Sequence, residues 1–232
     1  LCNITVIANN DATVINASQT FAIRPRVTVI SPNATHLLKV NTTYPNLIQW
    51  STTGTKINYV NINYSTDGAT FPYSIATHVN ASLGVYNWTT TPARTSPNAQ
   101  VLVYDEDAVY VNNSSSAFEI IGKLTIISPD SGSNAVIKDN STAIIWSPNN
   151  VTGLLNIYYS TTGGAPWTPI KSNIDPASIS TLWDPNSCDF LGNTTRIHIN
   201  SSADGRVNDT TANFTTIERF NIIHPENEVV TA

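Results

Sequence analysis

The sequence is poor in charge and contains no long apolar run. Only 12% of its 232 residues are charged, and the formal net charge of -5 comes without a block of basic residues. Phosphate backbones and anionic lipids attract basic patches, so nucleic acid and membrane surfaces are disfavoured as partners. Since no apolar run approaches the roughly 20 residues that a membrane helix needs, we expect no membrane span.

Methionine is absent, and the N-terminus lacks a basic segment followed by an apolar one. We therefore expect the chain to be a processed or trimmed product. Cys2 and Cys188 are the only cysteines, in a chain rich in N-glycosylation acceptors. This combination is typical of an oxidising compartment, so we expect an extracellular or cell-surface location.

Motifs for catalysis and metal binding are also missing. The chain has no G-x-S-x-G, P-loop or dinucleotide fingerprint. The histidines lack the spacing of metal ligands or of a nucleophile and its base: His36, His78, His198 and His224. Asp105-Glu106-Asp107 could ligate calcium, but the matching Ala8-Asn9-Asn10 lacks the charges, which favours an acidic turn. We expect no enzyme activity, no metal and no cofactor apart from covalent N-glycans.

What the sequence does contain is an internal repeat. Residues 4–32 and residues 101–129 align without a gap, and they share Val6/Val103, Phe21/Phe118 and Pro32/Pro129 among other pairs. Self-similarity of this kind indicates tandem modules, and the second copy lies where one module passes into the next. Since the first copy begins close to residue 1, we expect the chain to start inside a module.

Short strand-like runs, separated by Pro, Gly, Asn and Asp clusters, fill both repeats. In repeat one we predict strands at Val27–Ile30, Asn46–Ser51, Tyr59–Ser65, Ser74–Thr77, Gly84–Thr89, Gln100–Tyr104 and Ala117–Ile121. Seven short strands without helical periodicity are typical of an immunoglobulin-like sandwich. In repeat two, Trp146 matches Trp50 and Trp183 matches Trp88.

The predicted fold class is therefore all-β, with two tandem immunoglobulin-like β-sandwiches preceded by an N-terminal β-hairpin half-module. We predict the hairpin at residues 1–24, where it pairs with a neighbour, and the sandwiches at residues 25–121 and 122–223. Residues 224–232 are predicted to form a tail that begins the next strand.

The predicted hairpin consists of Ile4–Ala8 and Ala17–Ile23, with a turn at Asn9, Asn10 and Asp11 between them. If its apolar side chains stayed in water, the forgone burial would amount to on the order of 10 kcal/mol, comparable to the stability of a whole domain. We therefore predict that they form an assembly surface. Its residues are Ile4, Val6, Val14, Phe21 and Ile23.

Several short patterns recur in the repeats: I-x-S-P, I-x-W-S, I-x-Y-S-T-x-G followed by an aromatic residue, W-x-x-x-P and F-x-I. They are most specific at Trp50 and Trp146 and at Tyr64-Ser65-Thr66 and Tyr159-Ser160-Thr161. Together they resemble the Ser/Thr-rich, GPI-anchored cell-wall module of fungi and its tandem relatives in bacterial surface proteins. The resemblance implies an immunoglobulin-like or fibronectin-like sandwich used in walls and surface arrays, with no catalytic set. Trp183-Asp184-Pro185 departs from the spacing, which affects that loop.

The strongest chemical signal is the N-glycosylation sequon N-x-S/T, which occurs about twice as often as chance would give. We predict glycosylation at Asn3, Asn16, Asn33, Asn41, Asn63, Asn80, Asn87, Asn112, Asn113, Asn140, Asn150, Asn193, Asn200, Asn208 and Asn213. The alternative is that a surface rich in Asn and Thr produces sequons by accident. Asn112 and Asn113 are adjacent, and we do not expect both to be occupied.

The tryptophans could form either a core or a sugar-stacking platform. Trp50 and Trp146 follow alternating apolar residues, which favours packing between the sheets, and Trp88 and Trp183 are also expected in the core. Trp167 lies in a turn with two glycines, and the sequence leaves both roles open for it.

Cys2 and Cys188 each lie shortly before the same strand of their respective modules. A disulfide needs Cα atoms within about 7 Å, and a whole sandwich would separate the two cysteines in modules strung end to end. We therefore predict a bond between neighbouring chains, with a fold-back bond or free thiols as alternatives.

These observations predict a structural subunit of an extracellular, heavily N-glycosylated filament or surface array. The chain would assemble with itself, head to tail, as the hairpin adds its strands to a neighbouring chain. One alternative is a window from a longer covalent tandem array. Another is a carbohydrate-binding or adhesion module that uses exposed aromatics such as Trp167 and Tyr73.

Overall fold

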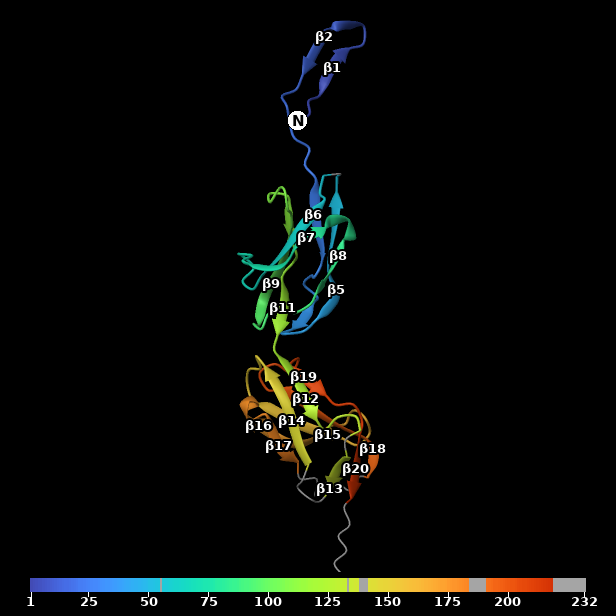
Figure 1. The fold of residues 1–232 in the computed structure, drawn as a ribbon, viewed down its shortest axis with the longest axis vertical. Helices are drawn as coiled ribbons and strands as arrows, with labels where there is room; N and C mark the ends of the chain where they lie inside the picture. The colour runs from blue at the N-terminus through green and yellow to red at the C-terminus, as the bar shows by residue number, and fades with distance from the viewer. Residues whose placement is uncertain (55, 133, 138–141, 184–190, 219–232) are drawn as a thin grey trace, which may run out of the picture. The chain divides into compact units, whose positions relative to one another are not determined.

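A computed structural model describes residues 1–54, 56–132, 134–137, 142–183 and 191–218. These residues are almost all in β-strands and turns, and the described part of the chain contains no α-helix (Figure 1). The chain divides into two compact units. The second unit starts at Ile121 and also takes in Lys39–Asn41 and Pro92–Thr95, while the rest belongs to the first.

The first sandwich contains nine strands in two sheets. One sheet has the order β3-β5-β8 and the other has the order β4-β11-β9-β6-β7, with β10 also pairing with β9. The strands are β3 Arg26–Ser31, β4 Leu37–Lys39, β5 Tyr44–Thr53, β6 Tyr59–Ser65, β7 Tyr73–Asn80, β8 Val85–Trp88, β9 Ser96–Asp105, β10 Asn112–Ser114 and β11 Phe118–Ile121.

The second sandwich repeats this plan. Its sheets have the orders β12-β14-β17 and β13-β20-β18-β15-β16, with β19 pairing with β18. The strands are β12 Lys123–Ser128, β13 Asn134–Ile137, β14 Thr142–Asn149, β15 Leu155–Ser160, β16 Thr168–Ile174, β17 Ser180–Trp183, β18 Gly192–Ser201, β19 Asn208–Thr210 and β20 Phe214–Glu218.

This strand order is that of an immunoglobulin-like sandwich. In the second sandwich, β12 pairs with β14 in one sheet. The short strand β13 that follows it lies in the other sheet, where it runs parallel to β20. The predicted all-β fold class of tandem immunoglobulin-like sandwiches is therefore confirmed. In immunoglobulin terms, β9 is strand F, and β10 and β11 together are strand G. We call these three strands, and their equivalents β18, β19 and β20, the F–G pair.

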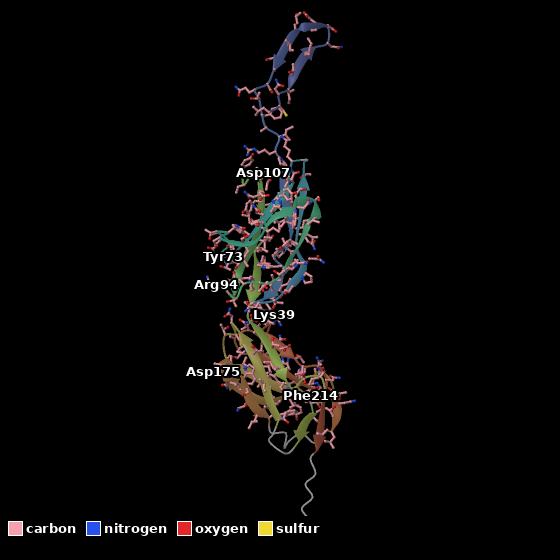
Figure 2. The ribbon with its side chains drawn as sticks, in the orientation of Figure 1. Lys39, Tyr73, Arg94, Asp107, Asp175 and Phe214 are labelled. Atoms are coloured by element: carbon pink, nitrogen blue, oxygen red, sulfur yellow. The ribbon has the colours of Figure 1, made fainter. Side chains whose placement is uncertain are left out.

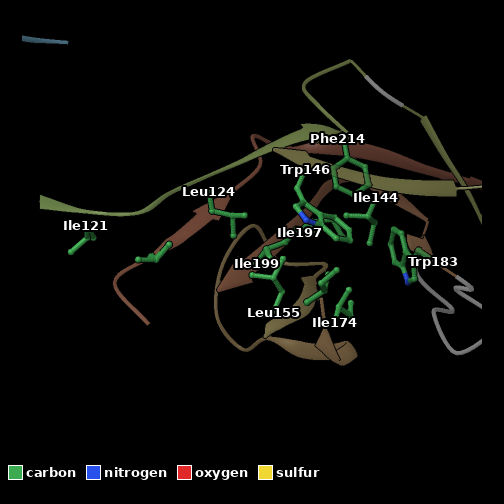
Figure 3. Close-up of a cluster of buried hydrophobic side chains, with 12 residues drawn as sticks. Ile121, Leu124, Ile144, Trp146, Leu155, Ile174, Trp183, Ile197, Ile199 and Phe214 are labelled. Atoms are coloured by element: carbon green, nitrogen blue, oxygen red, sulfur yellow. The ribbon is translucent and has the colours of Figure 1, made fainter. Parts of the chain in front are cut away.

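Each core is built around one tryptophan, which lies on β5 in the first sandwich and on β14 in the second. Trp50 and Trp146 are almost fully buried, and their indole N–H groups donate to the carbonyl oxygens of Ala81 and Pro176, both at 3.0 Å. Figure 3 shows Trp146 among the core side chains of the second sandwich, with Phe214 and Trp183 in the same cluster. A buried indole needs such a partner, since an unpaired N–H in an apolar core is costly.

All seven strands predicted for repeat one are present, most of them a few residues longer than expected. Two three-residue strands, β4 and β10, were not predicted. Strands this short carry too few alternating residues to be recognised by periodicity.

Candidate assembly site: an exposed strand pair

The N-terminal residues form a hairpin of β1 Thr5–Ala8 and β2 Asp11–Ala17. The sequence prediction was wrong about the second strand, which was placed at Ala17–Ile23. That segment contributes an isolated bridge between Phe21 and Cys2. Asp11 was assigned to the turn, but it begins β2, because Asn9 and Asn10 alone make a tight connection.

Side-chain oxygens hold both ends of the hairpin. The Asp11 carboxylate accepts from the backbone N–H of Thr13 at 2.9 Å and from its hydroxyl at 2.6 Å, and these bonds hold the pKa of Asp11 below its ordinary value. At the other end, the Ser18 hydroxyl accepts from the Ile4 N–H at 3.0 Å and donates to the Gln19 carbonyl at 2.9 Å. The hairpin is therefore closed by local hydrogen bonds.

The register of this hairpin is the register of the F–G pair in the first sandwich. Val6 faces Asn16 in the hairpin, and Val103 faces Asn113 in the pair. The bridge of Cys2 to Phe21 corresponds to the pairing of Ala99 with Phe118, which lie at the equivalent positions of the repeat. The Ser18 contacts recur at Ser115, whose hydroxyl accepts from the Val101 N–H at 3.0 Å and donates to the Ser116 carbonyl at 2.9 Å.

The second sandwich holds a third copy of the arrangement. Ile199 faces Asp209, Thr195 faces Phe214, and the Thr211 hydroxyl accepts from the Ile197 N–H at 3.0 Å. The gap-free alignment of residues 4–32 with residues 101–129 also matches Asn16 with Asn113 and Ser18 with Ser115, but the sequence alone indicates no structural role for these residues. Their shared register could only be seen in the structure.

The three copies differ in burial. The assembly residues predicted in the hairpin are between 40% and 78% exposed: Ile4, Val6, Val14, Phe21 and Ile23. Their counterparts in the first sandwich are 5% exposed or less: Val101, Val103, Val111, Phe118 and Ile120. The counterparts in the second sandwich are also buried: Ile197, Ile199, Val207, Phe214 and Thr216. Side chains that form a core in two places are thus open to water in the third.

One polar contact ties each buried F–G pair to the opposite sheet. The Asn113 side-chain oxygen accepts from the backbone N–H of Val29 in β3 at 2.8 Å. In the second sandwich, Asp209 accepts in the same way from Ile126 in β12 at 2.7 Å. Asn16 occupies the equivalent position in the hairpin and is exposed.

The predicted cysteine pair is only partly within the described residues. Cys2 is a free, exposed thiol at the start of the hairpin. Cys188 lies outside the described residues, so the bond between neighbouring chains stays a prediction.

The predicted glycosylation sites in the described residues are all on the surface or half-buried. The exposed asparagines are Asn3, Asn16, Asn41, Asn80, Asn87, Asn112, Asn150, Asn193 and Asn213. The half-buried ones are Asn33, Asn63, Asn113, Asn200 and Asn208, and Asn140 lies outside the described residues.

Two of the sequons also form turns. The Asn80 side-chain oxygen accepts from the backbone N–H of Ser82 at 3.0 Å and from its hydroxyl at 2.8 Å. Asn33 does the same with Thr35 at 3.1 and 2.7 Å. The N-x-S/T spacing thus has a local structural use, because an Asn oxygen reaches the backbone two residues on.

The aromatic residues divide as the sequence indicated. Trp50, Trp146, Trp88 and Trp183 are all buried, which confirms their predicted place in the core. Trp167 is half-buried, with its ring centroid 5.1 Å from that of His198. Tyr73 lies at the surface of β7, where it stacks on Tyr64 at 4.9 Å (Figure 2). Trp167 and Tyr73 are therefore both open, at least in part, to a ligand.

The acidic turn is held by its own hydrogen bonds. Asp105 is buried, and its carboxylate accepts from the Asp107 N–H at 3.2 Å. In the part of the chain that the structure describes, no group of three or more His, Cys, Asp and Glu side chains is placed to hold a metal ion.

His198 is half-buried next to Thr210, and this burial lowers the pKa of its imidazole, while the Asp209 carboxylate opposes the shift.

None of the helices in the described ranges is long and apolar enough to cross a membrane.

No family model matches the chain, and no curated protein matches it. Among solved structures, a fragment of the outer capsid protein Hoc of bacteriophage RB49 is similar, with 10% identity and a TM-score of 0.28 over 84% of this chain. Extracellular domains 3-5 of Drosophila OTK align with 12% identity, a TM-score of 0.28 and 84% coverage of this chain. An I-band fragment of titin aligns with 10% identity, a TM-score of 0.31 and 85% coverage. The chain spans 59%, 66% and 67% of these fragments, respectively.

Proposed function

We propose that the chain is a structural subunit of an extracellular, N-glycosylated filament or cell-surface array that assembles head to tail by strand complementation. The observation that carries the proposal is the exposed apolar face of the hairpin, whose counterparts in both sandwiches are core residues. No catalytic role is part of the proposal. The motifs that resemble fungal cell-wall modules and bacterial surface repeats support a place outside the cell.

The energetics favour a partner for the hairpin. Burying five large apolar side chains at about 1.5–3 kcal/mol each would contribute about 8–15 kcal/mol. Association costs about 4–15 kcal/mol in lost translational and rotational freedom, so side-chain burial alone need not give tight binding. Among the described residues, the edge of β1 opposite β2 pairs with no strand. Backbone hydrogen bonds along that edge would add about 0.5–1.5 kcal/mol each.

Such a contact joins two different surfaces, one on each chain. Contacts of this kind form rings when the rotation between subunits closes and open filaments when it does not. Glycans on the exposed asparagines would keep the assembly soluble, because only 12% of the residues are charged. They would also cover sheet edges that could otherwise pair without specificity.

Electron microscopy of the purified protein tests the proposal, with a variant that lacks residues 1–24 as the control. The wild-type chain is expected to form fibres or arrays, and the shortened chain to remain a folded monomer. Polymers that persist after the deletion would show that the hairpin does not drive assembly. The mass of the intact denatured protein decides the alternative of a longer covalent tandem array, which would give a single larger chain.

A carbohydrate-binding or adhesion module is the second candidate, and it rests on the exposed aromatics. Tyr73 is 40% exposed, and its stacking on Tyr64 presents an aromatic surface on β7. Sugars stack on such rings through their apolar faces. A glycan array with wild-type protein and with Tyr73→Ala and Trp167→Ala variants tests this role. Binding that is absent, or equal in all three proteins, would remove it.

A further inference from the structure

The hairpin has a second apolar face, opposite the one that carries Val6. Ile7 faces Ile15 across the two strands, and these side chains are 53% and 57% exposed. Successive side chains of a strand point to opposite sides of a sheet, so Val6 and its partner Asn16 lie on the other face. We call the side with Ile7 and Ile15 the outer face of the hairpin.

The equivalents of this outer face point away from the core in both sandwiches. Tyr104 faces Asn112 in the first sandwich, and Asn200 faces Asn208 in the second. Three of these four residues are sequon asparagines. The outer face of the hairpin is therefore an outer surface of its module, whatever strands cover the opposite face. In the hairpin alone, isoleucines replace residues that can carry a glycan.

The outer face of the β12-β14-β17 sheet has lost a sequon in the same way. Leu182 is 63% exposed, and it occupies the position of the sequon asparagine Asn87 in the first sandwich. Ile145 replaces Gln49, and Ile127 lies beside it, where the register between β12 and β14 shifts. The other side of this sheet faces the core shown in Figure 3. Aliphatic side chains thus gather on a sheet face that is polar in the first sandwich.

Ile179 extends this surface from a position where the backbone favours glycine. Its φ is 52°, and its carbonyl accepts from the Trp146 N–H at 3.0 Å, as the Gly84 carbonyl accepts from Trp50 in the first sandwich. A β-branched residue is rare in this left-handed conformation, and Ile179 is also 55% exposed. Strained residues of this kind are concentrated at functional sites. The aliphatic residues on this surface form what we call the sheet patch: Ile127, Ile145, Ile179 and Leu182.

We infer that the outer face of the hairpin in one copy of the chain packs on the sheet patch of a second copy. On both surfaces the equivalent positions carry a sequon, whose bulky glycan would hold two proteins apart. Aliphatic residues remove the glycan and add apolar area to bury. The strands of the hairpin contain one charged residue, Asp11, and those of the sheet contain one of opposite sign, Lys123, so charge also favours the contact.

This contact goes beyond the proposed function, which uses the edge of β1 and the face with Val6. Packing of one sheet face on another is the arrangement found inside β-sandwiches, so the two surfaces are of a suitable kind. Each copy offers one hairpin and one sheet patch, and the contact is therefore head to tail. Strand addition and this contact use different surfaces, so together they would join copies in two directions, as an array requires.

Photo-cross-linking in the intact chain tests the contact directly. A benzophenone amino acid replaces Ile15, and isotopically labelled and unlabelled chains are mixed, so that mass spectrometry identifies links between copies. We expect links from position 15 to the peptide that contains Leu182. The control places the same amino acid at Leu83, which is 60% exposed and belongs to neither surface. Links from position 83 to that peptide should be at least 10-fold fewer.

The repeat also supplies a matched pair of substitutions. Ile127 and Ile30 occupy equivalent positions and are both 54% exposed. Ile127→Asp should reduce the links from position 15 at least 10-fold, whereas Ile30→Asp should change them less than about 3-fold. Thermal unfolding should show that both sandwiches stay folded, and Leu182→Asp should act as Ile127→Asp does. Equal effects of Ile30→Asp and Ile127→Asp would overturn the inference.

A mixture of variants decides whether the contact joins two copies. A chain with benzophenone at position 15 and the Leu182→Asp substitution should form no links by itself, because every sheet patch present is altered. Addition of the Ile15→Asp chain supplies an intact sheet patch, so links should return and should lead only to the added chain. Links that form without the added chain, or that do not return with it, would overturn the inference.

The outcomes separate this contact from the proposed function. Fibres or arrays that form without the link from position 15 to the sheet patch would overturn the inference and leave the proposed function standing. The expected link in a protein that forms neither fibres nor arrays would support the contact and overturn the proposed assembly. Links from position 15 to the first sandwich instead would place the contact elsewhere and overturn the inference.

Discussion

The hairpin and the F–G pair of the first sandwich have nearly the same pattern of hydrogen bonds and opposite burial. Val6 is 67% exposed and Val103 is fully buried, although each faces an asparagine across a strand pair in the same register. Strand pairing is thus set by the turn and by local hydrogen bonds within each segment. Burial depends on strands from elsewhere in the module, and among the described residues no further strand pairs with β1 or β2.

The largest effect is expected when the same charge is introduced at the equivalent positions. Val103→Asp places a carboxylate in a core without a partner, and we expect it to destabilise the first sandwich by about 4–5 kcal/mol or more. Val6→Asp should leave both sandwiches within about 0.5 kcal/mol of wild type. Denaturant unfolding followed by tryptophan fluorescence measures both. Equal destabilisation would mean that the hairpin already packs into a core of this chain.

Truncating the shared phenylalanine is expected to have a somewhat smaller effect. Phe118 is 1% exposed, and Phe118→Ala should cost about 3–5 kcal/mol through lost burial and a cavity. Phe21→Ala should cost less than about 0.5 kcal/mol in the unassembled chain. The same unfolding measurement applies, and the comparison fails if the two alanine variants cannot be told apart.

Removing the side-chain oxygen that reaches the opposite sheet should have an intermediate effect. Asn113→Ala leaves the Val29 N–H without its acceptor, so we expect a loss of about 1–3 kcal/mol in the first sandwich. Asn16→Ala should change neither sandwich. Both variants should be measured in protein made without N-glycosylation, because both residues lie in sequons. An unchanged stability of Asn113→Ala would show that water replaces the bond at no cost.

The smallest effect concerns the third copy, where His198 occupies the position of Leu102. Burial lowers the pKa of His198, so the unfolded chain takes up a proton at a higher pH than the folded chain does. The contribution of the neutral His198 imidazole to the stability of the second sandwich is therefore complete above the ordinary pKa of 6.5, and it is lost as the pH falls below that value. Since the side chain is partly exposed, the loss should be only a few tenths of a kcal/mol.

The control for this pH effect is a variant in which His198 is replaced by leucine, the residue at the equivalent position 102 of the first sandwich. The midpoint of thermal unfolding of the second sandwich should fall slightly more between pH 7.5 and pH 5 in wild type than in the His198→Leu variant. An equal or larger pH dependence in His198→Leu would remove His198 as its source.

The sequence predicted the fold class well because its signals were local and repeated. Alternating apolar residues in Tyr59–Ser65, together with the matched tryptophans Trp50 and Trp146, indicated strands and cores that the structure confirms. The second hairpin strand was misplaced because the apolar residues at Phe21 and Ile23 resemble a strand more than the polar start of β2 does. The register that relates the hairpin to the F–G pair depends on which residues face each other, and the order of residues along one chain does not contain that information.

The Asn80 turn allows one side chain to shape the backbone and to carry a sugar. Its oxygen Oδ1 accepts the two hydrogen bonds from Ser82, whereas an N-glycan is attached through the amide nitrogen Nδ2. The turn therefore forms in the same way before and after modification, because each function uses a different atom. Glycan occupancy at such a site can vary from molecule to molecule without changing the path of the chain.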